Sequence, residues 1–187
     1  MLNILFFGDS LTAGYGLVNP AAESFPALIG QKLQTEYPGF RVINAGMSGD
    51  TSGGGLNRID YWLSRPVDVF VLELGINDVI RQMPPSTTQK NLQAIIDKVK
   101  IKYPAAKMAL MGMRLPDFLH SPFTAQFNSI YPQIAVANKM ALVPFFLEGV
   151  AGKSNLNLGD KIHPSAEGYK VIAANVWPVI RGLIAGK

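Results

Sequence analysis

Three polar side chains in this sequence could together perform acyl transfer with a serine nucleophile. Ser10 directly follows an apolar run at residues 2–7 that has the length of a β-strand. Ligands of open α/β sheets bind beyond the carboxyl ends of the strands, so a hydroxyl at this position is a candidate nucleophile. Such a serine needs a base, a group that orients the base, and donors for the developing oxyanion. The plainer interpretation of Ser10 is a polar residue in a turn.

The supply of bases is small, because the chain contains only two histidines, His120 and His163. Asp160 precedes His163 by three residues, so its carboxylate can reach the imidazole Nδ1 from the same loop and fix the tautomer. Asp160 could equally be an ordinary turn or cap residue. His120 lies in an apolar loop and is the weaker candidate. The sequence therefore favours His163 as the base of a Ser10 nucleophile, and both interpretations of Asp160 stay open at this point.

Donors for an oxyanion must come from the ends of other strands. A glycine-rich segment at residues 46–55 follows a second apolar run, and we expect a free backbone N–H at Gly46. Asn77 follows a third run and could direct its side-chain amide into the same crevice, although asparagine is also common in turns. Ser48 is a rival nucleophile. However, residues 46–50 read Gly-Met-Ser-Gly-Asp and lack the final glycine of a nucleophile elbow.

A metal site is the competing use of the carboxylates near these strand ends. Four aspartates could hold Mg²⁺ for phosphoryl transfer. Each also has a plain role as a turn or cap residue, and no metal-binding loop spacing is present, so we expect neither a metal nor a cofactor. The four residues are Asp9, Asp50, Asp78 and Asp160.

The elements that must position these residues alternate between strands and helices. This alternation implies right-handed crossovers and a parallel sheet between two helix layers. We predict a flavodoxin-like three-layer α/β fold with five parallel strands in the order 2-1-3-4-5, whose carboxyl ends bring the polar residues to one edge. The predicted strands are 2–7, 40–45, 67–74, 107–113 and 141–146; the helices are 23–37, 56–63, one capped by Ser86, 123–139 with Pro132 inside it, and one from Ser165 to about Ile184.

Composition limits the classes of function. At 187 residues with 48% hydrophobic and 16% charged residues, the chain is expected to form one globular domain, 1–187. The net charge of +4 comes from scattered lysines and arginines, so we expect no nucleic-acid partner. The absence of cysteine excludes disulfides and thiolate chemistry. No apolar run reaches the roughly 20 residues of a membrane span, so we expect no stable membrane insertion.

Four blocks in the sequence resemble those of the GDSL, or SGNH, hydrolase family. They occur in the family's order over almost the whole chain. Residues 23–28 and 72–75 are similar, more narrowly, to the bacterial branch of arylesterases and multifunctional thioesterase/lysophospholipases. The blocks are Gly8-Asp9-Ser10-Leu11, Gly46 with Ser48-Gly49-Asp50-Thr51-Ser52, Gly75-Ile76-Asn77-Asp78, and Asp160-Lys161-Ile162-His163-Pro164.

The resemblance implies a Ser10–His163–Asp160 triad and an oxyanion hole formed by the Ser10 N–H, the Gly46 N–H and the Asn77 amide. It implies a metal-independent esterase acting on small-molecule carboxylic esters with short to medium acyl or aryl groups, and extends to thioesters and lysophospholipids. The family is also described as having mobile loops at the active site, which the glycines at 46, 49 and 53–55 would permit. Because the base must be neutral, activity should fall below about pH 6.5, the unperturbed histidine pKa.

Two alternatives stay open at this point. One is a carbohydrate acetylesterase on the same scaffold, and the other is a non-catalytic flavodoxin-like module that binds a phosphate-bearing ligand. As given, the chain is expected to be cytoplasmic, or periplasmic or secreted if a signal peptide was removed. We expect a monomer or a weak dimer.

Overall fold

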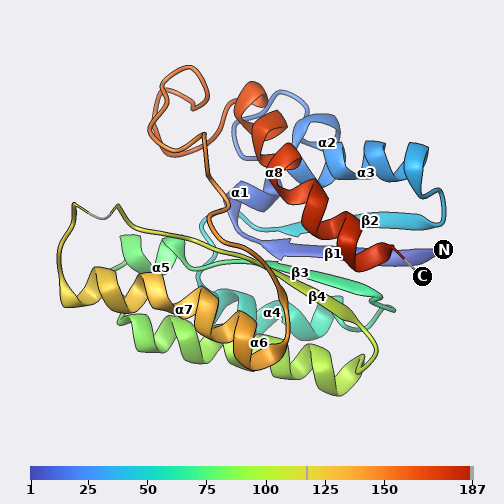
Figure 1. Ribbon diagram of the computed structural model, residues 1–187, viewed down its shortest axis with the longest axis horizontal. Helices are drawn as coiled ribbons and strands as arrows, with labels where there is room; N and C mark the ends of the chain where they lie inside the picture. The colour runs from blue at the N-terminus through green and yellow to red at the C-terminus, as the bar shows by residue number, and fades with distance from the viewer. Residues whose placement is uncertain (117, 186–187) are drawn as a thin grey trace.

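The computed structural model describes residues 1–116 and 118–185, and a five-stranded parallel sheet forms its centre (Figure 1). The strand order is β2-β1-β3-β4-β5, and every neighbouring pair is parallel, so the predicted topology is confirmed. The strands are β1 (Leu2–Gly8), β2 (Phe40–Gly46), β3 (Val69–Glu73), β4 (Lys107–Met111) and β5 (Ala141–Val143).

Helices cover both faces of the sheet (Figure 1). Each layer packs apolar side chains onto the sheet, as an α/β architecture requires. One layer contains α1 (Ser10–Ala13), α2 (Pro20–Glu23), α3 (Phe25–Glu36) and α8 (Ala166–Ile184), and the other contains α4 (Ser52–Trp62), α5 (Ile76–Ile80), α6 (Pro85–Lys102) and α7 (Pro122–Asn138).

The central strands are apolar along their whole length because both of their faces are covered. Phe6 and Phe7 are fully buried neighbours in β1, and they pack toward opposite layers. The Phe6 ring contacts Phe25 of α3 at a centroid distance of 5.3 Å. The Phe7 ring lies under the guanidinium of Arg58 of α4, 4.0 Å from its Cζ. The core of β1 is therefore continuous with both helix layers.

Several predicted boundaries move in the structure. Helix α4 begins at Ser52, inside the glycine-rich segment that was predicted as a loop, and the Thr51 side chain caps it by accepting from the Gly54 N–H at 3.1 Å. Ser86 is not the cap of α6, because that helix already begins at Pro85. Helix α7 continues through Pro132, whereas Ser165 caps α8 as predicted. The short helices α1, α2 and α5 were not predicted.

The register of the sheet aligns the ends of three strands. Gly8 of β1 lies beside Gly46 of β2 and Glu73 of β3. A side chain at position 8 would come within 2.6 Å of the Glu73 Oε2 and 2.1 Å of the Thr12 Oγ1, so glycine is required at this close approach. The segments after β1, β2 and β3 therefore start from neighbouring points.

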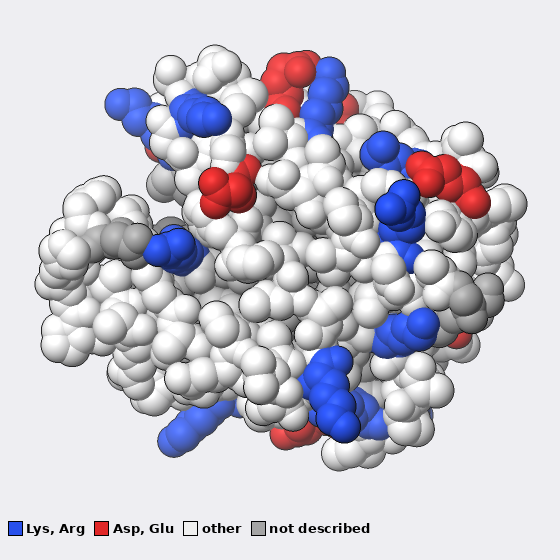
Figure 2. All heavy atoms as spheres, viewed as in Figure 1, with Lys and Arg blue, Asp and Glu red and all other residues white. Residues whose placement is uncertain are grey.

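On the face shown in Figure 2, lysine and arginine side chains are spread out and interspersed with acidic ones. Within the described residues, no helix combines the length and the apolar character that crossing a bilayer would require.

Candidate active site

Ser10, His163 and Asp160 lie together at the carboxyl end of the sheet. The Ser10 Oγ lies 3.0 Å from the His163 Nε2, and the His163 Nδ1 lies 2.7 Å from the Asp160 Oδ2. Ser10 is the first residue of α1 and is 7% exposed. These distances place a hydroxyl, an imidazole and a carboxylate in one hydrogen-bonded chain, the arrangement that activates a serine for nucleophilic attack.

The loop that carries His163 is held by Asp160 itself. The Asp160 Oδ1 accepts hydrogen bonds from the backbone N–H groups of Ile162 at 2.9 Å and of His163 at 3.0 Å. The hydrogen bond from the His163 ring, together with these two N–H donors, lowers the pKa of the Asp160 carboxyl to about 2. Asp160 therefore stays ionised at every pH at which this protein would be expected to work. The Asp160 side chain thus stabilises the turn through its Oδ1 and hydrogen-bonds to the histidine through its Oδ2.

An aromatic ring supports the imidazole. The Tyr15 and His163 rings have a centroid distance of 4.5 Å and an interplanar angle of 46°. Tyr15 lies just after α1 and is half exposed. Sequence reasoning missed this contact, because nothing in the spacing of residues 15 and 163 links the two segments.

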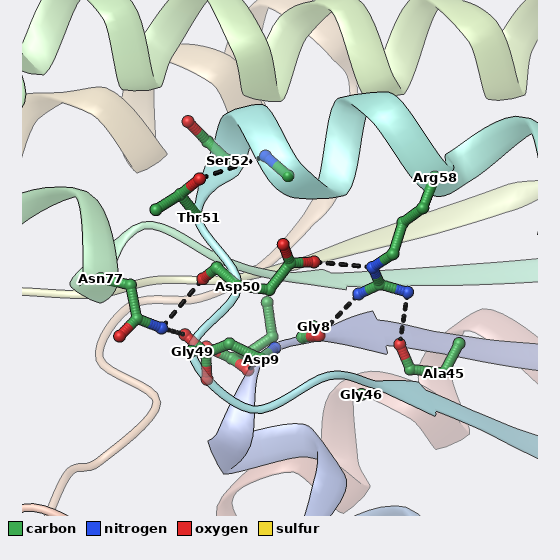
Figure 3. Close-up of polar contacts among 12 residues, drawn as sticks. Gly8, Asp9, Ala45, Gly46, Gly49, Asp50, Thr51, Ser52, Arg58 and Asn77 are labelled. Carbon is green, nitrogen blue, oxygen red and sulfur yellow. Dashed lines mark hydrogen bonds and ion pairs between the residues drawn. The ribbon is translucent and has the colours of Figure 1, made fainter.

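The Asn77 amide reaches the same edge from α5 (Figure 3). Its Nδ2 donates to the Asp9 Oδ2 at 3.0 Å and to the Asp50 carbonyl at 2.9 Å. Asp9 precedes Ser10, so the amide lies next to the segment that carries the hydroxyl. The predicted convergence of Asn77 with the end of the first strand is present in the structure.

The expectation of a free N–H at Gly46 is wrong in this structure. The Gly46 N–H donates to the Asn44 Oδ1 at 2.9 Å, while the Asn44 Nδ2 donates to the Thr12 carbonyl at 2.9 Å. A side chain at position 46 would lie 2.2 Å from the Ala13 N, so this glycine allows α1 to pack closely on β2. Gly49 differs from Gly46 because it is exposed, has a φ of +79°, and its N–H has no acceptor among the described residues.

Arg58 joins the separate segments of this edge, as Figure 3 shows. Its Nε donates to the Asp50 Oδ2 at 2.6 Å, its Nη1 to the Ala45 carbonyl at 2.9 Å and its Nη2 to the Gly8 carbonyl at 2.9 Å. The planar guanidinium suits such a multiple contact better than a lysine would. One side chain thus connects the ends of β1 and β2 with the loop that precedes α4.

The chain was compared with known proteins. The family model for the GDSL-like lipase/acylhydrolase family matches residues 6–171. This chain belongs to that family. Esterase TesA of Pseudomonas aeruginosa is 37% identical over 97% of this chain and 89% of its own length. An arylesterase of Vibrio mimicus is 36% identical over 91% of this chain and 84% of its own length. A crystal structure of TesA superposes with a TM-score of 0.90 and covers 97% of this chain and 99% of that one.

Membership of the GDSL-like family confirms the resemblance noted in the sequence and makes the protein a serine hydrolase of the esterase class. The rival serine of the family's second block, Ser48, is exposed and makes no hydrogen bond to a histidine in the described part of the chain. His120 is likewise exposed, in the loop before α7. The structure therefore pairs Ser10 with His163, and neither Ser48 nor His120 takes part in this contact.

Each of the four carboxylates considered as metal ligands forms a hydrogen bond or an ion pair with another residue of this chain. Asp50 pairs with Arg58, and Asp160 pairs with His163. Asp78 accepts from the Ser52 N–H at 2.8 Å, from the Ser52 hydroxyl and from the Thr88 hydroxyl at 3.1 Å. Asp9 accepts from Leu11 and Asn77. Across residues 1–116 and 118–185, no three acidic or histidine side chains form a group that could hold a metal ion.

Proposed function

We propose that this protein hydrolyses small carboxylic esters through an acyl-enzyme on Ser10. The observation that carries the proposal is the 3.0 Å contact from the Ser10 Oγ to the His163 Nε2, continued by 2.7 Å from the His163 Nδ1 to the Asp160 Oδ2. His163 accepts the hydroxyl proton while Ser10 attacks the ester carbonyl, and then protonates the leaving alcohol. It next activates a water molecule, which hydrolyses the acyl-enzyme and regenerates Ser10.

The developing oxyanion requires donors that converge near the Ser10 hydroxyl. The Ser10 N–H has no acceptor among the described residues, which supports its use as one donor. The Asn77 amide is the second, and one of its hydrogens has to leave the Asp9 Oδ2 or the Asp50 carbonyl for the substrate oxygen. The Gly49 N–H replaces the predicted Gly46 as the third donor, because the Gly46 N–H is bonded to Asn44 whereas the Gly49 N–H is free to meet a ligand.

The substrate class follows from the apolar side chains of two segments at the carboxyl end of the sheet. Ile80 is 59% exposed, and Phe118 and Leu119 are 76% and 47% exposed in the segment after β4. Exposed apolar groups of this size favour an acyl or aryl group over a sugar. We therefore propose short to medium acyl esters and aryl esters as substrates. Thioesters and lysophospholipids are further candidates, since a relative from Escherichia coli is named a thioesterase and lysophospholipase.

Labelling with an organophosphonate tests the chemistry directly. The reagent should abolish hydrolysis of a chromogenic ester, and peptide mapping should find the modification on Ser10. The Ser10→Ala variant should resist labelling and lose activity by about 10⁴-fold or more. Ser48→Ala is the matched control and should be labelled at the wild-type rate. Labelling at Ser48, or no labelling at all, would overturn the assignment.

An acyl-chain-length series tests the substrate class. Chromogenic esters from acetyl to decanoyl should give the highest kcat/KM beyond acetyl, since each buried methylene contributes about 0.8 kcal/mol to transition-state binding. Replacing Phe118 by Ser should lower kcat/KM for the longer chains and leave acetyl esters unchanged. Hydrolysis confined to acetylated sugars would favour a carbohydrate acetylesterase instead.

A further inference from the structure

Two buried carboxyl groups lie directly beneath the nucleophile, and the reaction described above does not use either of them chemically. Asp9 precedes Ser10, and Glu73 ends β3 beside Gly8 in the sheet. Asp9 is 0% exposed and Glu73 is 1% exposed. Acidic side chains are almost never buried this completely without a charged partner, so the pair requires a physical explanation.

The donors around this pair are few, and all are uncharged. The Glu73 Oε2 accepts from the Asp9 N–H at 3.2 Å and from the Thr12 hydroxyl at 2.8 Å. The Asp9 Oδ1 accepts from the Leu11 N–H at 2.9 Å, and the Asp9 Oδ2 from the Asn77 Nδ2 at 3.0 Å. The Glu73 Oε1 is the one buried side-chain oxygen of the described residues that lacks a hydrogen-bond partner.

Among residues 1–116 and 118–185, no cation forms an ion pair with Asp9 or Glu73. Arg58 is the guanidinium at this edge, and its nitrogens are occupied by the Asp50 carboxylate and by the carbonyls of Gly8 and Ala45. Two adjacent negative charges in this environment would each oppose the ionisation of the other.

The surroundings favour one retained proton. Burial, followed by the charge of Glu73, holds the pKa of Asp9 well above its usual range, and burial also raises the pKa of Glu73. The Asp9 N–H donates to the Glu73 Oε2, so the two residues are in direct contact, and carboxyl groups that interact this closely titrate as a pair. Burial also raises the pKa of both phenols that face the pair, so they remain protonated. The facing groups are Tyr131 of α7, Tyr169 of α8, Asp50, Asp78 of α5 and Arg58 of α4.

We propose that Asp9 and Glu73 hold one proton between them, and that Asp9 in this singly protonated pair positions the Asn77 amide for the oxyanion. The shared proton supplies the missing donor within the pair and halves the negative charge beneath Ser10. The first half of the proposal is independent of the proposed function. The second half rests on it, because it assigns a purpose to the orientation of Asn77.

The geometry explains why the proton matters to Asn77. An amide nitrogen carries two hydrogens, and those of Asn77 point to the Asp9 Oδ2 and the Asp50 carbonyl. A carboxylate accepts more strongly than a neutral acid, so a fully ionised pair would retain the amide hydrogen and repel an oxyanion. A pair that carries one proton fixes the same orientation and releases the hydrogen more readily to the substrate oxygen. Asp9 is thus a positioning residue that acts through Asn77.

Two isosteric variants separate the parts of this proposal. In Glu73→Gln the amide supplies a permanent donor to Asp9, so it mimics the singly protonated pair. We expect turnover at neutral pH within about threefold of wild type and the loss of any decline in rate at alkaline pH. In Asp9→Asn the side chain keeps only one oxygen, so it can no longer accept from both the Leu11 N–H and the Asn77 Nδ2. We expect kcat to fall about 10-fold to 100-fold with KM unchanged, a fraction of the 10²–10³ expected for a lost oxyanion donor.

A double-mutant cycle tests whether Asp9 acts through Asn77. In an Asn77→Ala background, Asp9→Asn should cost less than about threefold in kcat, because the group that Asp9 positions is already absent. An equal loss in both backgrounds would overturn the positioning role.

The proton itself is tested without any substrate. Infrared difference spectra of the wild type at neutral pH should contain the carbonyl band of a protonated carboxyl that is missing in Glu73→Gln. The native state binds this proton more tightly than the unfolded chain, whose carboxyls titrate near pH 4, so wild-type stability should decline as the pH rises above about 5. Glu73→Gln should decline less steeply.

Identical spectra and identical slopes in the two proteins would overturn the shared proton. If Ser10→Ala kept full hydrolysis, the proposed function would fail, while the spectra and the unfolding data would still decide about the pair.

Discussion

The two sides of the active site are built in opposite ways. On the side that carries Ser10 and Asn77, Ser10 is buried and Asn77 is half-buried, and Arg58, whose side chain is 15% exposed, connects this side across β1, β2 and α4. The side that carries His163 is a loop whose carboxylate, Asp160, is 39% exposed and whose backbone is held by hydrogen bonds among residues 156–165. Rigid support is thus concentrated where the oxyanion would form, and the base is placed by short-range contacts.

This difference has a physical reason. Electrostatic stabilisation of an oxyanion requires donors that do not reorganise during the reaction, and buried, cross-linked segments provide them. A base must exchange protons with the substrate and with water, so an exposed loop suits it. Variants on the two sides should therefore separate activity from stability.

The largest effect is expected on the exposed side. His163→Gln removes the base, so kcat should fall by about 10⁴-fold or more. The free energy of unfolding in urea should change by no more than about 1.5 kcal/mol, the energy of its ring contact with Tyr15, because Asp160 and not the imidazole holds the backbone of this loop. His120→Gln is the control and should leave both quantities unchanged. A large loss of stability in His163→Gln would show that the two sides are not built differently.

On the buried side, Arg58→Met should act on stability first. The variant leaves the Asp50 carboxylate without its partner and deprives two carbonyls of donors, which should cost about 3–5 kcal/mol. Arg58→Lys keeps the charge beside Asp50, so it should lose less stability than Arg58→Met. It should still lose some, because an ammonium does not reproduce the planar contacts with Gly8 and Ala45. Urea midpoints with unchanged m-values would measure this difference. Equal midpoints for wild type and Arg58→Met would contradict the joining role.

The pH profile provides a third test of the comparison. Asp160, with a pKa of about 2, stays ionised as the pH falls, so it should not contribute to the acid limb. Protonation of His163 removes the base, and the rate should decrease about tenfold per pH unit once the imidazole is charged. Initial rates between about pH 4 and pH 8 would measure this limb. A rate that stays constant down to about pH 4 would exclude His163 as the base.

The smallest predicted effect concerns Tyr15. Its ring contacts the imidazole on the exposed side, and such pairs contribute about 0.5–1.5 kcal/mol, which corresponds to roughly threefold to tenfold in rate. Tyr15→Leu should lower kcat by that factor, whereas Tyr15→Phe should keep it. Tyr15→Leu should lower the free energy of unfolding by no more than about 1.5 kcal/mol, the energy of the same contact, and Tyr15→Phe should unfold at the wild-type midpoint. A loss in Tyr15→Phe equal to that in Tyr15→Leu would assign the effect to the hydroxyl instead.

The sequence predicted the sheet well for a specific reason. Strands buried on both faces are apolar along their whole length, and parallel strands end at one edge, so the convergence of Ser10, Asn77 and His163 followed from the pattern. Helix α4 was predicted too short because glycine was interpreted as loop. In the structure Gly55 is helical, and a side chain there would come within 2.5 Å of the Leu74 Cδ1, so the small residue serves close packing.

The errors in the site have a common origin. Gly46 was predicted as a donor from its place after a strand, but its N–H donates to the side chain of Asn44. The pattern of residue types does not indicate which nearby acceptor a backbone N–H will use. Asp9 was interpreted as a cap residue, which is correct for its contact with Leu11. Its pairing with Glu73 spans 64 residues and depends on the register of β1 with β3, which the sequence does not encode locally.

The support of the segment after β4 has a practical consequence for engineering. Leu115 is held by Asn128 of α7 through hydrogen bonds of 2.8 and 3.0 Å. An exchange of this segment for that of another esterase would have to keep this anchor to α7. Libraries confined to the segment would test whether it selects the substrate.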